Sequence, residues 1–215
     1  MLFFDGVDDT DQPVIRWNLL RYDRNTRTYQ MIHSLCYFIM QNLLLSTEHG
    51  NTKLPQFSDE HMNLLFQRFI MEYYKKHHPE YKAAAKQIKW NFSDNSASSS
   101  NILPIMQSDI TLALGERTLI IDTKYYSKNL QEHFGKFTIH SPNFYQIHTY
   151  VMNEDRGHTG KVDGMLLYAK TTAEIQPGGN FETNDGNILM VRVLDLTQDF
   201  ENIKADLENL MNYMY

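Results

Sequence analysis

Two aspartates and a lysine fall at the ends of two aliphatic runs that read as neighbouring β-strands. Asp109 precedes the run 110–114, and Asp122 and Lys124 follow the run 119–121. Gly115 and the residue after it suit a two-residue type II′ hairpin turn. In the register that this turn sets, Asp109 lies opposite Asp122 on one face, and the aliphatic pairs lie on the other. Lys124, two residues beyond Asp122, points to the same side as the carboxylates.

This arrangement predicts a metal-dependent hydrolytic site. Two opposed carboxylates destabilise a sheet unless something binds them. A hard divalent cation with oxygen ligands solves this, and Mg²⁺ fits, with Mn²⁺ as a substitute. Lys124 can then position a water or stabilise charge that builds on a phosphate. The alternative is that an aspartate and a lysine two residues apart occur by chance, on an edge strand that displays charges for solubility.

A second group of polar residues follows this hairpin. Gln146 and Tyr150 are four residues apart on a predicted helix, so they share a face, and they can direct an amide and a phenol at a nucleic acid. The alternative is an ordinary surface or core-edge pair. Lys128 and Lys136 are candidates for a DNA path, or else solvated surface charges. The polar segment 127–140, which contains Gly135, is either a flexible loop over the DNA or a plain connector.

The elements that must position these residues follow from periodicity and turn signals. Helices are predicted over 26–45, 58–76, 141–151 and 197–215. Strands are predicted over 87–92, 102–114, 117–125, 164–170 and 188–196. Residues 93–101 read as a polar loop, and 177–180 and 184–186 as turns. Ser141 is expected to cap its helix, with Pro142 in the first helical position. This order predicts an α/β or α+β fold with a mixed central sheet flanked by helices.

Composition restricts the class of protein. The chain has 215 residues and a formal net charge of −6, which argues against a protein that coats nucleic acid. One cysteine, Cys36, excludes a disulfide framework and fits a reducing, cytoplasmic setting. No apolar run reaches the length of a membrane span, and the first residues lack the features of a signal peptide. The nine histidines show no metal-ligand spacing, and no phosphate-binding loop motif is present.

The strings 103–112, 118–126 and 164–168, together with Gln146 and Tyr150, resemble the McrC endonuclease subunits of McrBC modification-dependent restriction systems, within the PD-(D/E)xK nucleases. The resemblance implies a restriction-endonuclease-like core that hydrolyses DNA phosphodiesters with Mg²⁺. It also implies double-stranded DNA as a partner, with modified cytosine as a candidate feature, and an McrB-like AAA+ GTPase. Residues 26–215 are expected to form the nuclease domain, and 1–25 an extension left from a partner-binding region. A homo-oligomer stays an open alternative, and no membrane partner is expected.

The resemblance also implies roles for individual residues. Asp109 and Asp122 would hold the metal, the carbonyl group of Thr123 would be a further ligand, and Lys124 would orient the attacking water or stabilise the transition state. Gln67 stands where family members often carry glutamate, and its amide oxygen adds no charge. Glu72, five residues on, lies about 140° away around the helix and is a poor substitute.

Two other functions compete with a nuclease of the McrC type. Gln67 favours a catalytically weak or inactive nuclease fold that binds DNA or serves assembly, whereas Asp109, Asp122 and Lys124 favour an active enzyme. An exonuclease of the RecB-like class is a third reading, and the lone cysteine weakens it for members that carry an iron–sulfur cluster.

Overall fold

The computed structural model describes residues 16, 19–22, 59–92, 102–133 and 135–214. The contacts divide the chain into two units, Met1–Gln56 and Phe57–Tyr215. In the first unit the described residues form one turn, in which the Leu19 N–H donates to the Arg16 carbonyl at 3.0 Å. The predicted helix 26–45, Cys36, the loop 93–101 and the domain boundary after residue 25 lie outside the described residues. That boundary therefore stays a prediction.

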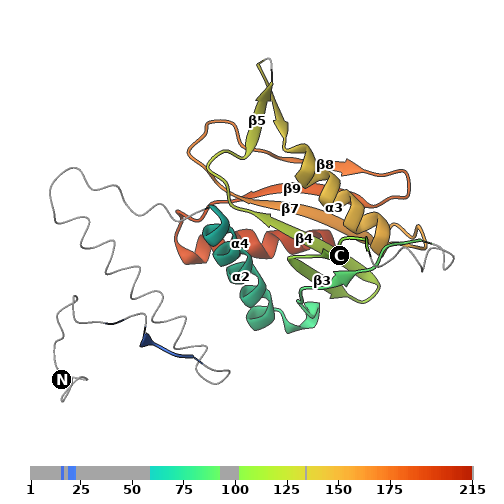
Figure 1. Ribbon diagram of the computed structural model, residues 1–215, viewed down its shortest axis with the longest axis horizontal. Helices are drawn as coiled ribbons and strands as arrows, with labels where there is room; N and C mark the ends of the chain where they lie inside the picture. The colour runs from blue at the N-terminus through green and yellow to red at the C-terminus, as the bar shows by residue number, and fades with distance from the viewer. Residues whose placement is uncertain (1–15, 17–18, 23–58, 93–101, 134, 215) are drawn as a thin grey trace. The chain divides into compact units, whose positions relative to one another are not determined.

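The second unit is built on a five-stranded mixed sheet with the order β3-β4-β7-β9-β8 (Figure 1). The strands are β3 (Ile110–Leu114), β4 (Arg117–Lys124), β7 (Val162–Ala169), β8 (Gly179–Glu182) and β9 (Ile188–Leu194). Pairs β3–β4 and β8–β9 are antiparallel, whereas β4, β7 and β9 run parallel. The predicted mixed sheet flanked by helices is thereby confirmed.

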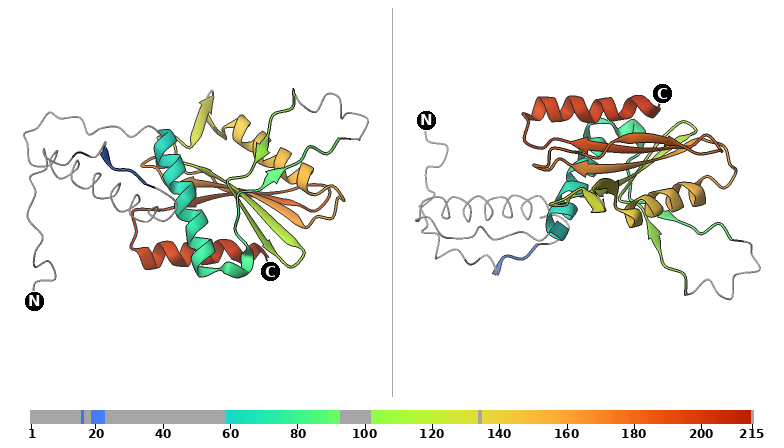
Figure 2. Two further views of the ribbon diagram at one scale, coloured as in Figure 1. Left: turned by 60° about the horizontal axis from the view of Figure 1, so that its bottom comes forward. Right: turned by 90° about the horizontal axis from the view of Figure 1, so that it is seen from above.

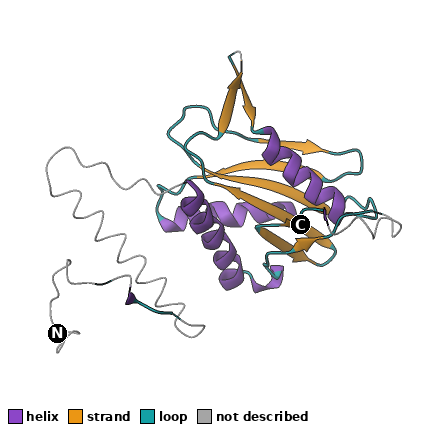
Figure 3. Cartoon of the chain, in the orientation of Figure 1, coloured by secondary structure: helices purple, strands orange, loops and turns teal. Residues whose placement is uncertain are grey.

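Three helices cover the two faces of this sheet. Helices α2 (Asp59–His77) and α4 (Phe200–Leu210) pack on one face, and α3 (Ser141–Glu154) packs on the other (Figures 2 and 3). Side chains alternate along each strand, so Ile121 joins the α2/α4 core whereas Ile120 and Leu166 join the α3 core. No helix among the described residues is long and apolar enough to cross a membrane.

Gly164 lets α3 approach the sheet closely. A Cβ atom at this position would lie 2.8 Å from side-chain carbons of both Ile147 and Val151 on α3. Such distances are far below van der Waals contact, so any larger residue would push the helix away from β7. The glycine therefore helps to set the distance between α3 and β7, which pairs with the strand that carries Asp122.

The β3–β4 hairpin has the predicted register. Leu114 pairs with Arg117, and Ile110 pairs with Ile121. Gly115 has a φ of 58°, and Glu116 is not among the residues with positive φ. This is the pattern of a type II′ turn. The aliphatic pairs fix the register because a slip by one residue would turn all of them to the wrong face.

The predicted strand 102–114 is wrong in its extent, because the chain breaks it at Ser108 and Asp109. Its first part is β2 (Met106–Gln107), which pairs with β1 (Gln87–Ile88), and its second part is β3. Ser108 holds the break, since its N–H donates to the Lys86 carbonyl and its hydroxyl accepts from the Lys86 N–H, both at 3.0 Å. Strand β1 is shorter than predicted, because after Ile88 side-chain hydrogen bonds take the place of backbone pairing. For example, the Trp90 indole N–H donates to the Pro104 carbonyl.

Segment 127–140 is a hairpin, neither the flexible loop nor the plain connector that were expected. Strands β5 (Leu130–His133) and β6 (Lys136–Ile139) pair antiparallel, and Gly135 turns between them with a φ of 74°. The predicted turn at 177–180 instead leads into β8, where the Arg192 guanidinium donates to the Gly179 carbonyl at 3.0 Å. Both corrections depend on pairing partners that local turn signals do not reveal.

Two helix starts also differ from the prediction. The N-cap of α3 is His140, so Ser141 and Pro142 are already helical. Helix α4 begins at Phe200 and ends at Leu210, and a 3-10 turn, Met211–Met214, follows it. Its start is delayed because the Asp195 carboxylate accepts from both the N–H and the hydroxyl of Thr197, which forms a turn after β9.

Candidate active site

Asp122 is a buried carboxylate near the carboxyl end of β4, on the face that α3 covers. It is 2 % exposed. Burial raises its pKa to about 6, Lys124 opposes this rise, and Asp109 adds to it. A buried acid with such a pKa is typical of a functional site.

Lys124 is the nearest charge to Asp122. Its ammonium nitrogen lies 2.7 Å from Asp122 Oδ2, and its side chain is 12 % exposed. Oδ2 is buried, and the Lys124 ammonium is its polar partner in the described part of the chain. Burial alone would lower the pKa of Lys124, but the Asp122 carboxylate outweighs it and raises that pKa. Lys124 therefore stays a cation at neutral pH.

Asp109 joins the site from just outside the ladder. The predicted pairing of Asp109 with Asp122 does not form, since β3 begins at Ile110. Instead, Asp109 Oδ2 accepts hydrogen bonds from the N–H and the hydroxyl of Thr123, both at 2.7 Å. The carboxylate takes the place of a backbone partner at Thr123, where β4 extends past the end of its ladder with β3. Asp109 thus lies beside the strand segment that carries Asp122 and Lys124.

Gln67 approaches from α2 on the other side of the hairpin. Its amide nitrogen lies 3.5 Å from the backbone carbonyl oxygen of Asp109, which is a weak hydrogen bond. Glu72 does not substitute for it, because its side chain is exposed and pairs with Lys75. The residue that α2 contributes to the site, Gln67, is therefore an uncharged amide.

Gln146 and Tyr150 extend the site along α3. Lys124 Nζ donates to Gln146 Oε1 at 3.3 Å, and Gln146 Nε2 donates to the Tyr150 hydroxyl at 2.9 Å. Tyr150 also packs in the α3 core. The structure thus links Asp122, Lys124, Gln146 and Tyr150 in one row of polar side chains, which supports the predicted shared face.

Sequence reasoning missed a buried polar bridge next to this row. Asn143 is 6 % exposed, and its amide nitrogen donates to the Tyr168 hydroxyl at 3.2 Å. Its amide oxygen accepts from the Tyr126 hydroxyl at 3.3 Å. Asn143 therefore ties the first turn of α3 to β7 and to the segment after β4. Its position three residues before Gln146, on the same helix face, is the signal that could have revealed it.

Lys128 and Lys136 form no hydrogen bond or ion pair with the polar row in the described part of the chain. Both are exposed, and neither ammonium forms an ion pair or hydrogen bond within the described ranges. Lys128 borders an open hollow of about 690 Å³ between the β5–β6 hairpin and residues 173–175. The structure therefore does not bring these lysines to the carboxylates.

The donor set at Asp109 and Asp122 fits a hard cation such as Mg²⁺. Asp122 offers a buried carboxylate whose one ion pair among the described residues is with Lys124. The Gln67 amide oxygen and the Thr123 carbonyl are candidate neutral ligands nearby. The described residues contain no cluster of three or more His, Cys, Asp or Glu side chains suited to a metal. A cation held by two carboxylates and completed by neutral oxygens and water is typical of Mg²⁺.

Comparison with known proteins identifies relatives. The chain matches the family described as McrBC 5-methylcytosine restriction system component over residues 1–169. It is 30% identical over 154 residues to the type IV methyl-directed restriction enzyme EcoKMcrBC of Escherichia coli strain K12, which covers 71% of this chain and 44% of that protein. A chain in the solved half-complex of Thermococcus gammatolerans McrB AAA+ hexamers with bound McrC is similar with a TM-score of 0.49 and 17% identity, over 71% of this chain and 33% of that one.

The chain thus spans less than half the length of the relatives that it matches. The family match nevertheless covers well over half of the chain, and it agrees with the resemblance that the sequence motifs indicate. This chain belongs to the McrBC 5-methylcytosine restriction system component family.

Proposed function

We propose that this chain is the Mg²⁺-dependent endonuclease domain of an McrC-type restriction subunit, which hydrolyses DNA phosphodiesters. The observation that carries the proposal is the buried Asp122 carboxylate beside the Lys124 ammonium, with Asp109 held next to them by Thr123. A fold gains little stability from a buried carboxylate whose pKa is raised to about 6. A functional role explains such a group better than a role in packing does.

In this proposal Asp109 and Asp122 hold the cation, with Gln67 and the Thr123 carbonyl as supporting ligands. When bound, Mg²⁺ supplies Lewis-acid activation of the phosphate and a more acidic water. Lys124 contributes a fixed positive charge that stabilises the developing negative charge on the phosphate. Gln146 accepts a hydrogen bond from Lys124 and so holds the ammonium in place.

The partners in this proposal are double-stranded DNA, with modified cytosine as the signal for cutting, and an McrB-like AAA+ GTPase. The chain has no phosphate-binding loop motif of its own, so GTP hydrolysis must come from that partner. The net charge of −6 predicts weak intrinsic affinity for DNA, because few phosphates can be neutralised. We therefore expect the isolated chain to cut slowly and the partnered chain to cut well.

A second candidate function is a nuclease fold that binds or assembles without cutting. Two observations favour it. Gln67 adds no charge to the site, and Asp109 Oδ2 already accepts two hydrogen bonds from Thr123. Both features weaken the attraction for a divalent cation relative to a site with three free carboxylates.

The test is cleavage of methylated plasmid by the chain together with an McrB-like GTPase from the same source, in GTP and Mg²⁺. Asp122→Asn should lower the rate by at least about 100-fold without loss of folding. Asp199→Asn is the matched control, because Asp199 is exposed and its side chain forms no capping hydrogen bond. An unchanged rate in Asp122→Asn contradicts the proposed site. No cutting by the wild-type pair favours the inactive fold.

A further inference from the structure

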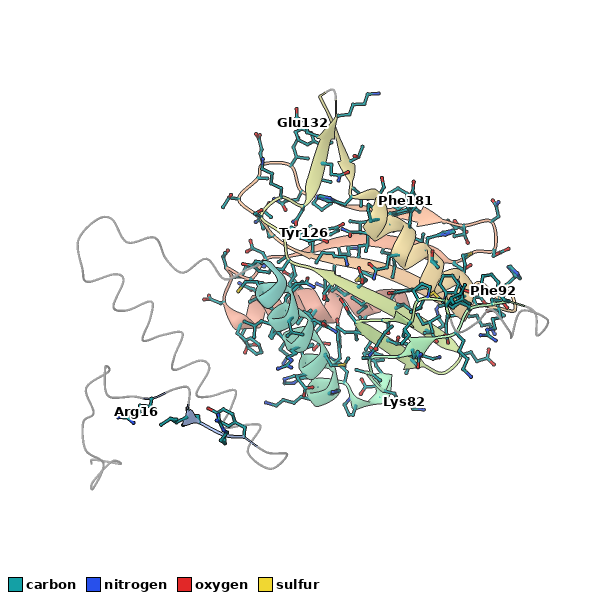
Figure 4. All side chains as sticks on the ribbon, in the orientation of Figure 1. Arg16, Lys82, Phe92, Tyr126, Glu132 and Phe181 are labelled. Atoms are coloured by element: carbon teal, nitrogen blue, oxygen red, sulfur yellow. The ribbon has the colours of Figure 1, made fainter. Side chains whose placement is uncertain are left out.

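The β5–β6 hairpin, residues 130–139, projects from the sheet as a two-stranded arm. In Figure 4 Tyr126 lies at its base, and Glu132 lies toward its tip. The arm begins six residues after Lys124, and the helix that carries Gln146 starts directly after it. Both chain ends of the arm are therefore anchored at the candidate active site.

One face of the arm is directed toward its own chain. Leu130 pairs with Ile139 and Glu132 pairs with Phe137, so these four side chains share a face. Leu130, Glu132 and Phe137 border the hollow of about 690 Å³, across from the segment that contains Ile175. This face therefore borders an open hollow, and residues 173–175 line the other side of that hollow.

The other face of the arm is polar. Gln131 pairs with Thr138, and Lys136 is two residues from Thr138, so the three share this face. Their side chains form no hydrogen bond or ion pair among the residues that the structure describes, although Gln131 also borders the hollow. An amide, a hydroxyl and an ammonium that are not used within the protein provide donors and acceptors for a ligand.

The charge of the arm differs from that of the rest of the sheet. Lys161 is paired with Glu116, and Lys170 with Asp195. Lys128 and Lys136 have no such acid partner in the described ranges. In a chain with a net charge of −6, residues 128–139 carry two lysines and one glutamate, and this local excess of positive charge favours an anionic ligand.

We propose that the arm enters a groove of the DNA duplex, with its polar face toward the DNA and Lys128 and Lys136 against phosphates. This inference rests on the proposed function for the identity of the substrate. Two-stranded ribbons fit the major groove, which is about 8.5 Å deep. Four residues per strand give the arm a length of about 13 Å, which is enough to reach the groove floor. Lys128, only four residues from Lys124, then contacts a phosphate close to the one that is cut.

The test uses binding, so that it does not depend on cutting. The full-length chain with Asp122→Asn is titrated with a fluorescent DNA duplex at several salt concentrations. Lys128→Gln and Lys136→Gln should each lower the slope of log affinity against log salt by about 1. Lys76→Gln on α2 is the matched control, since Lys76 is exposed and has no acid partner in the described residues. It should leave the slope unchanged.

Two neighbouring residues test which face meets the DNA. Thr138→Glu places a negative charge on the polar face and should weaken binding at least fivefold more than Phe137→Glu, which places it on the face that borders the hollow. Equal effects, unchanged salt slopes or no DNA binding overturn the proposal. A change of oligomeric state in these variants by analytical ultracentrifugation, without a change in slope, assigns the arm to a contact between protein copies and also overturns it. Salt slopes that fall as predicted, in a chain that does not cut DNA even with Asp122 intact, would instead refute only the nuclease assignment.

Discussion

Replacing Asp122 by asparagine should stabilise the metal-free protein at pH 8. The Asp122 carboxylate is buried, and burial raises its pKa to about 6 from an ordinary value of 3.8. At a pH between these two pKa values, the Asp122 carboxyl group has lost its proton in the unfolded chain but still carries it in the native protein. A rise in pH through this window therefore lowers the free energy of unfolding, and the penalty is complete above pH 6.

The size of this penalty follows from the pKa. A rise of about two pKa units corresponds to about 3 kcal/mol. For a domain of this size, 1 kcal/mol shifts the melting temperature by about 2–4 °C. Asp122→Asn should therefore raise the melting temperature by about 10 °C at pH 8. At pH 4 the wild-type carboxylate is protonated in the native state, so the two proteins should melt at similar temperatures.

The assay is thermal unfolding from pH 4 to pH 8 in chelator, with Asp199→Asn as the control for an exposed carboxylate. Mg²⁺ added at ten times its Kd should stabilise the wild type by about 1.4 kcal/mol, and the Asp122→Asn protein far less. The difference between variant and wild type cancels the titration of all other groups. A variant that is less stable than the wild type at pH 8, or a difference that does not grow between pH 4 and pH 7, would refute the reasoning.

Three further predictions concern residues around the site. Gln67→Glu adds a third carboxylate, so it should tighten Mg²⁺ binding about tenfold in a thermal titration, and an unchanged Kd would show that Gln67 is no ligand. Asn143→Ala removes the hydrogen bond to the Tyr168 hydroxyl, so the helix that carries Gln146 loses an anchor. The variant should lower kcat about tenfold with little change in KM. A KM that changes as much as kcat would contradict a positioning role. Asp155→Ala removes a buried acceptor of four hydrogen bonds and should cost about 3 kcal/mol in urea unfolding. Burial opposes these bonds, but together they lower the pKa of Asp155 to about 2, so its stabilisation should be lost as the pH falls from 4 to 2.

The β3–β4 hairpin could be predicted in full because its information is local. Gly115 specifies the turn, and the aliphatic residues on either side permit only one register. The same period of two places Asp122 and Lys124 on one side, and their 2.7 Å contact follows from it. The start of helix α3 was equally accessible, because Ser141 and Pro142 place it within one residue, whereas the helix extends past the predicted end to Glu154.

The break at Ser108 could not be predicted, because it depends on a hydrogen bond to Lys86, which is 22 residues away. Without that break Asp109 would pair with Asp122 in the ladder. With it, the carboxylate is free to accept from Thr123. The site thus differs from the predicted geometry by a tertiary contact that no local pattern reports.

The β5–β6 arm and the bridge at Asn143 also depend on contacts between residues far apart in the sequence. Polar residues around Gly135 are typical of a loop, and only the pairing of Leu130 with Ile139 makes a hairpin of them. Asn143 has partners on β7 and after β4, so its role depends on how α3 packs against the sheet.

The most direct test of the central claim is an anomalous difference map from crystals of the chain soaked in Mn²⁺. A peak is expected at about 2.1–2.3 Å from carboxylate oxygens of both Asp109 and Asp122. The Lys124 ammonium is expected to move away from Asp122 Oδ2, from which it now lies 2.7 Å. An empty site at a Mn²⁺ concentration that supports cleavage, with Lys124 still in contact with Asp122, would contradict the proposed metal site.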